Sequence, residues 1–151
     1  MNWKTEAKEK LRRYDAMRLA IINIPEEIER LKTEATSIRS SRTDSTPVQG
    51  GGNKREDALL NNIIERQELE RNLQQAQLWV KTTNRALEVL SPEEKLILHR
   101  LYIYPEKGSI DRLSHELGFE KSTVYRKRDK ALIKFTLAFY GATETYYADV
   151  K

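Results

Sequence analysis

The stretch IDRLSHELGFEKSTVYRKR, residues 110–128, decides how the C-terminal third of the chain folds. Its first eight residues place apolar side chains at intervals of three and four, which predicts the buried face of a short helix. Ser109 precedes that face and belongs to a residue type that caps helix N-termini. The apolar face consists of Ile110, Leu113 and Leu117.

A tight turn and a second helix follow. Gly118 lies where the chain must turn sharply, and glycine adopts a positive φ at little cost. Ser114 is small and lets a second helix cross closely, while Val124 of that helix would fill the gap between the two. A short helix, a glycine turn and a second helix with a free outer face form a helix-turn-helix, which places side chains in a DNA major groove. The stretch therefore predicts binding to double-stranded DNA.

The composition favours an all-α protein with a basic C-terminal part. The chain has 151 residues, of which 33% are charged and 8% aromatic, with a net charge of +4 and a pI near 9.2. Positive charge concentrates in the second helix of the motif, as nucleic-acid binding requires. Between residues 121 and 134 the acidic residue is Asp129, and the basic residues are Lys121, Arg126, Lys127, Arg128, Lys130 and Lys134.

Several other kinds of site find no support in the sequence. Cysteine is absent, so disulfides and thiolate metal sites are excluded. His99 and His115 have no second ligand at metal spacing, and the side chains of Ser114-His115-Glu116 would point in different directions on a helix. There is no apolar run of membrane-spanning length and no secretion signal at the N-terminus. We expect a soluble cytoplasmic protein with no membrane association, no cofactor, no metal and no enzymatic activity.

Residues 1–90 predict a long-helix hairpin or coiled coil. Two helical segments, one ending near Ala35 and one from about Arg55 to Leu90, carry near-heptad apolar stripes. Neither can bury its stripe alone, so they pair with each other or with a second copy in a homodimer. Pro25 predicts a kink or restart at Asn23-Ile24-Pro25. The first stripe is Leu11, Tyr14, Met17, Ile21, Ile24, Ile28, Leu31 and Ala35; the second is Leu59, Ile63, Leu73, Ala76, Val80, Leu87 and Leu90, with polar gaps at Gln67 and Thr83.

Residues 36–54 predict a flexible linker between these helices. The segment is rich in serine, threonine and glycine and lacks apolar periodicity. Its triplet Gly50-Gly51-Gly52 lacks the strand and the lysine-serine/threonine pair of a phosphate-binding loop.

Residues 91–141 predict a separate DNA-binding module, followed by a tail of residues 142–151. Ser91-Pro92-Glu93-Glu94 is a strong helix start in which serine caps the helix and Glu94 completes a capping box. A loop is expected at residues 104–108. The second helix of the motif, the recognition helix, should run from Lys121 to Phe139 or beyond.

These residues resemble a known family. LSPEE at 90–94, IDRLSHELG at 110–118, STV at 122–124 and AL at 131–132 are similar to the C-terminal promoter-reading helix-turn-helix of sigma factors. The whole layout, including PVQGGG at 47–52, resembles the sigma-like late-gene regulators of phages of Gram-positive bacteria, the RinA/ArpU type. The resemblance implies an all-α transcriptional regulator of phage or prophage late genes. It would act in the bacterial host cell and allows contact with the host RNA polymerase.

Two positions depart from the sigma pattern. Glu120 stands where serine or threonine usually caps the recognition helix, and Arg128 stands where an apolar residue is common. We expect the stem of Arg128 to lie along the edge of the core with its charge in solvent.

Helical geometry assigns roles to the side chains around Val124. Residues of the first turns read base edges in such a helix, and Arg126 can read guanine through its paired donors. Phosphate contacts fix the register without reading sequence. We expect base contacts from Lys121, Ser122, Tyr125 and Arg126, with Thr123 on one flank; phosphate contacts from Lys127, Arg128 and Lys130; and backbone contacts from Ser109 and Arg112. Tyr125 can equally pack at the core edge.

Three functions are compatible with this sequence. The first is a promoter-binding regulator whose N-terminal helices mediate self-association or contact with polymerase. The second is a small terminase subunit that recognises a packaging site, although such subunits more often carry the DNA-binding module first. The third is a coiled-coil adaptor whose basic helix is merely solvated, which predicts no salt-dependent affinity for DNA.

Overall fold

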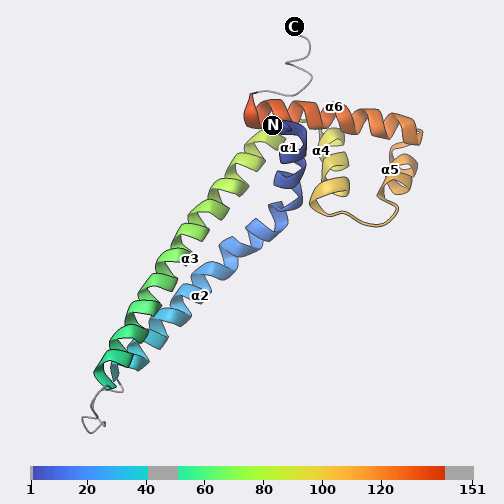
Figure 1. Cartoon of the computed structure of the whole chain (residues 1–151). Coiled ribbons are helices and arrows are strands. Elements are labelled where there is room, and N and C mark those ends of the chain that lie inside the picture. The colour runs from blue at the N-terminus through green and yellow to red at the C-terminus, as the bar shows by residue number, and fades with distance from the viewer. Residues whose placement is uncertain (1, 41–50, 142–151) are drawn as a thin grey trace. The chain divides into compact units, whose positions relative to one another are not determined.

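The computed structural model describes residues 2–40 and 51–141, and these residues contain helices and no strand. The expected all-α class is confirmed. The helices are α1 (Trp3–Arg12), α2 (Tyr14–Ser40), α3 (Gly51–Glu88), α4 (Pro92–Leu98), the π-helix η2 (His99–Ile103), α5 (Ser109–Leu117) and α6 (Lys121–Tyr140). Figure 1 shows their order along the chain.

The chain divides into two compact units, and the division differs from the predicted boundary between residues 90 and 91. The first unit joins the chain up to Met17 with the chain from Leu78 onward, and the second is Arg18–Gln77. The reason is a long-range apolar core that no local pattern reveals. Residues from α1 and from the end of α3 share that core with the C-terminal helices: Ala7, Leu11, Ala86, Leu90, Leu98, Tyr102, Ile103, Ala131, Leu132 and Phe135.

In the first unit, α1 crosses beneath α6 (Figure 1). Ala7 and Leu11 are fully buried in this contact. At the end of the crossing, the rings of Trp3 and Tyr140 lie 5.0 Å apart between centroids. Trp79 donates a hydrogen bond of 3.0 Å to the carbonyl of Lys10. The N-terminal helix is therefore a structural part of the unit that contains α4, α5 and α6.

Of the kink or restart expected at Asn23-Ile24-Pro25, the restart does not occur. The chain breaks instead at Arg13, and α2 continues through Pro25 to Ser40. Pro25 is exposed, so water can bind the carbonyl of the preceding turn that proline leaves without a donor.

In the second unit, α2 and α3 lie side by side and run in opposite directions (Figure 1). On α2 the predicted stripe is buried at Ile28, Leu31 and Ala35. On α3 the predicted stripe is half-buried at Leu59 but is wrong at Ile63. Ile63 is 37% exposed and Asn62 is 5% exposed, because the amide of Asn62 donates to the carbonyl of Leu31 at 2.8 Å. A satisfied amide thus takes the seam position assigned to isoleucine.

The predicted linker is too long at both ends. Thr36–Ser40 belongs to α2 and Gly51–Lys54 to α3, while the remainder of the linker, like the tail at 142–151, lies outside the described residues. The hydroxyls of Thr36 and Ser40 donate to the carbonyls one turn earlier, at 3.1 and 2.7 Å, so these polar residues are accommodated within the helix.

The helix start at Ser91 is as predicted. The amide of Glu94 donates to Ser91 Oγ at 3.2 Å, and the amide of Ser91 donates to Glu94 Oε1 at 3.1 Å, which completes the capping box. Leu98 and Tyr102 are buried in the core. Within the described ranges, no helix combines the length and apolar character needed to cross a membrane.

Candidate nucleic-acid interface

A tight turn joins α5 to α6, the two helices that the sequence predicts as a helix-turn-helix. Gly118 closes α5 with a φ of 71°, as its position predicts. Ser114 Oγ donates to the carbonyl of Phe119 at 2.5 Å, and the amide of Phe119 donates to the carbonyl of Ser114 at 3.1 Å. These bonds fix the direction in which α6 leaves the turn. Leu113 and Val124 are fully buried between the two helices, as expected.

The recognition helix begins at Lys121 as predicted, with Glu120 at the cap position. Glu120 makes no side-chain hydrogen bond to the helix, so the departure from serine or threonine leaves this N-terminus without a side-chain cap. The buried face is the predicted one, with Val124, Ala131, Leu132 and Phe135 fully buried.

The opposite face of α6 exposes Ser122, Tyr125, Arg126 and Lys130. The Arg126 guanidinium donates to Thr123 Oγ1 at 3.3 Å, a contact that keeps its charge available for an anion. Tyr125 is 42% exposed and lies under the guanidinium of Arg128, 4.9 Å from the ring centroid. Packing of Tyr125 at the core edge, the open alternative, does not occur.

Other predicted contact residues are held in ion pairs. Lys121 Nζ lies 2.6 Å from Asp111 Oδ1, and the hydrogen bond and charge of that carboxylate raise the pKa of Lys121. Arg112 pairs with Glu106. Water screens exposed pairs of this kind, so they add little to the stability of the fold.

Lys127 and Arg128 are more enclosed. Lys127 Nζ lies 2.6 Å from Glu93 Oε1 and 4.6 Å from the ring centroid of Phe119. Arg128 is half-buried and donates to Asp129 Oδ1 from Nη2 at 2.9 Å. The charge of Arg128, which was expected to lie in solvent, is paired with Asp129.

Ser109 has a different role from the predicted one. The N-cap of α5 is Gly108, with a φ of 72°, and α5 begins at Ser109 itself. Ser109 is 8% exposed and its hydroxyl donates to the carbonyl of Glu106 at 2.6 Å. The hydroxyl therefore holds the loop before α5, and the geometry offers no surface at Ser109 for a phosphate.

An open groove of about 350 Å³ lies between α4 and α6. Two of its lysines pair with the acids at the start of α4: Lys127 with Glu93, and Lys134 with Glu94 at 2.9 Å. Arg126 and Lys130 line it without an acidic partner among the ion pairs of the described residues. Sequence reasoning missed this groove, because the pairing joins residues about forty positions apart. The groove is lined by Ser91, Glu93, Glu94, Thr123, Arg126, Lys127, Lys130 and Lys134.

The described residues gather no set of three His, Asp or Glu side chains that could hold a metal ion. The ring of His99 packs against Tyr104, with 4.9 Å between centroids.

Comparison with protein families gives one match. Residues 37–136 match the model of a family described as "Protein of unknown function (DUF1492)". The chain belongs to this family. The part matched to DUF1492 includes every predicted contact residue from Ser109 to Lys130, and it excludes α1. Neither the curated proteins nor the solved structures that were compared include a match to the chain.

Proposed function

We propose that this DUF1492 protein is a sequence-specific DNA-binding regulator that inserts the first turns of α6 into the major groove. One observation carries the proposal: the Gly118 turn and the buried contact of Leu113 with Val124 leave Ser122, Tyr125 and Arg126 together on an exposed face. Helix-turn-helix proteins present the N-terminal residues of their second helix in this way.

The side chains divide into two roles. The fork of donors on Arg126 suits the two acceptors of guanine, and Ser122 and Tyr125 lie beside it for further base contacts. Lys130 is suited to binding a phosphate. Phosphates are also bound by three residues whose carboxylate partners they displace: Lys121, Arg112 and Lys127. The resemblance to sigma-like phage regulators adds the biological setting, which is promoter DNA of phage or prophage late genes. Host RNA polymerase and a second copy of the chain are the partners that this setting suggests.

Replacement of Arg126 by alanine tests the proposal. The loss of one bidentate base contact should reduce discrimination between a selected and a scrambled duplex by about 1 to 3 kcal/mol, or roughly 5- to 150-fold. Fluorescence anisotropy with a duplex selected by the full chain from a randomised pool measures this ratio. Lys81→Ala is the control, because it removes the same charge from an exposed position on α3. Equal discrimination by the wild type and Arg126→Ala would refute base reading by α6.

Selection from genomic fragments separates regulation from the alternatives. Fragments upstream of late structural or lysis genes support the regulator, whereas fragments within terminase genes support a packaging subunit. If no DNA fragment is enriched at any salt concentration, the adaptor is the only one of the three functions that remains.

A further inference from the structure

A second basic surface lies on the side of α6 that faces α1. Lys4, Lys8 and Arg12 follow one another at intervals of four along α1, so they share one edge of that helix. This edge faces α6, because Lys4 Nζ lies 3.7 Å from Asp129 Oδ1. The buried residues Ala7 and Leu11 fix α1 in this place. The lysines of this surface therefore stand on a helix that is packed into the core.

The cations of this surface crowd one another. Asp129 is shared by Lys4 and by Arg128, which donates to it at 2.9 and 3.2 Å. Arg12 pairs with Glu9 on α1 itself, at 2.9 Å. Burial lowers the pKa of Lys8, and the nearby charges of Lys4, Arg128 and Arg12 lower it further, with Asp129 opposing them. A further anion at this surface would relieve the repulsion.

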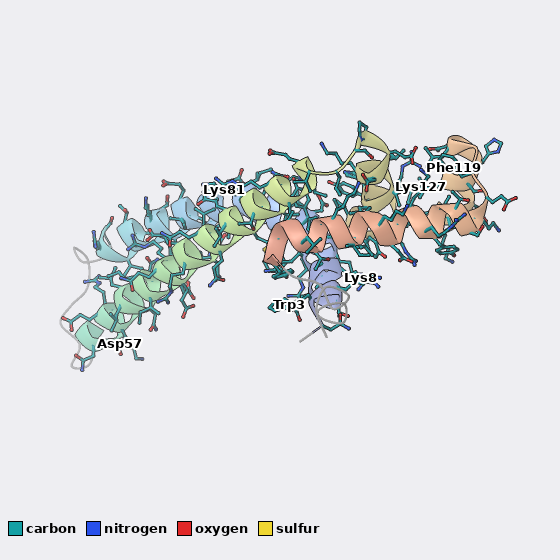
Figure 2. The ribbon with its side chains drawn as sticks, turned by 90° about the horizontal axis from the view of Figure 1, so that it is seen from above. Trp3, Lys8, Asp57, Lys81, Phe119 and Lys127 are labelled. Carbon is teal, nitrogen blue, oxygen red and sulfur yellow. The ribbon has the colours of Figure 1, made fainter. Side chains whose placement is uncertain are left out.

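The two basic surfaces flank the recognition helix. In Figure 2, which looks onto α6 from above, Lys8 and Lys127 lie on opposite sides of the helix. Lys127 belongs to the α4 side together with Lys130, and Lys8 belongs to the α1 side together with Lys4 and Arg128.

The width of the DNA major groove can be compared with the diameter of α6. A helix with its side chains is about 10–12 Å across, and the major groove is about 12 Å wide. The phosphates of the two strands therefore run along the two flanks of an inserted helix. The α4 groove supplies cations to one strand, and α1 lies where the other strand passes.

We propose that α1 is part of the DNA interface, and that Lys4 and Lys8, together with Arg128, contact phosphates of the strand on the far side of α6 from α4. This inference rests on the proposed function. It assigns DNA contact to a segment outside the range matched to the family, where the sequence predicted only self-association or polymerase contact.

The test is the salt dependence of DNA affinity for the variant Lys4→Gln/Lys8→Gln in the full chain. Each phosphate contact contributes about 0.9 to the slope of log K against log salt. The double variant should flatten the slope by about 1.8, and discrimination between the selected and the scrambled duplex should stay at the wild-type ratio. Lys4→Arg/Lys8→Arg keeps both charges and should keep the wild-type slope.

The matched control is Lys54→Gln/Lys81→Gln, which removes two charges from exposed positions on α3. Circular dichroism and tryptophan fluorescence verify that each variant is folded. If wild type binds and Arg126→Ala loses discrimination, but the Lys4/Lys8 variant has the slope of the Lys54/Lys81 control, the role of α1 is refuted while the proposed function stands. If the wild-type chain binds no duplex, both fail.

Discussion

Glu94 joins the start of α4 to α6, and its charge should stabilise the unit that contains these two helices. Its Oε1 atom accepts hydrogen bonds from the Ser91 amide at 3.1 Å and from Lys134 Nζ at 2.9 Å, and its side chain is only 11% exposed. A hydrogen bond to a charged group contributes about 1.5 to 3 kcal/mol. Glutamine keeps the shape and the cap but loses the charge, and Lys134, 54% exposed, regains water. We expect Glu94→Gln to lower the free energy of unfolding by about 2 kcal/mol at neutral pH.

The effect should disappear in acid. Burial opposes ionisation of Glu94, but the hydrogen bonds from Lys134 and Ser91 outweigh it, so the pKa of Glu94 lies below its ordinary 4.5. A carboxylate with a lowered pKa in the folded state stabilises the fold above its unfolded pKa, and this contribution is lost as the pH falls through the folded pKa. The difference between the wild type and Glu94→Gln should therefore shrink below pH 4.5.

Urea unfolding followed by tryptophan fluorescence measures this difference. Trp3 and Trp79, the two tryptophans of the chain, both lie in the unit that contains Glu94, so their emission reports on it. Glu88→Gln, an exposed position on α3, is the control. A loss of stability that is the same at neutral pH and near pH 3, or no larger than that of Glu88→Gln, would show that the buried ion pair contributes nothing.

Substitutions at two further positions test the turn and the groove. Gly118→Ala should cost about 1 to 2 kcal/mol in urea unfolding, since the φ of 71° is strained for alanine although a Cβ would meet open space; Gly118→Asn should cost less, and an equal cost for both would contradict the backbone explanation. Lys127→Gln should flatten the salt slope of DNA binding by about 0.9, as measured by anisotropy, because one phosphate contact is lost; an unchanged slope would mean that Lys127 contacts no phosphate.

Several local features of the segment from Ser91 to Tyr140 could be predicted from the sequence because their signals lie close together in the chain. The φ of Gly118, the capping box of Ser91 and the burial of Val124 depend on residues only a few positions away. The exposed candidates for base contact, Ser122 and Arg126, follow from the same helical geometry.

Predictions that needed distant partners were less accurate. On α3 the spacing of apolar residues favoured Ile63 for the buried position against α2. Asn62 is buried there instead, because its side-chain amide donates a hydrogen bond to the carbonyl of Leu31 on α2. A hydrogen bond formed by the fold thus decides between positions of similar propensity.

The sequence by itself determined the all-α class, the start of α4, the turn at Gly118 and the buried face of α6, since these features depend on backbone preferences and side-chain periodicity over a few turns. Only the tertiary structure decided that Ala7 and Leu11 pack with Phe135 in one core, and that α1 consequently brings Lys4 and Lys8 to the flank of α6. Apolar burial has no direction and does not specify which distant stripe covers another, so this contact could not be predicted from the sequence pattern.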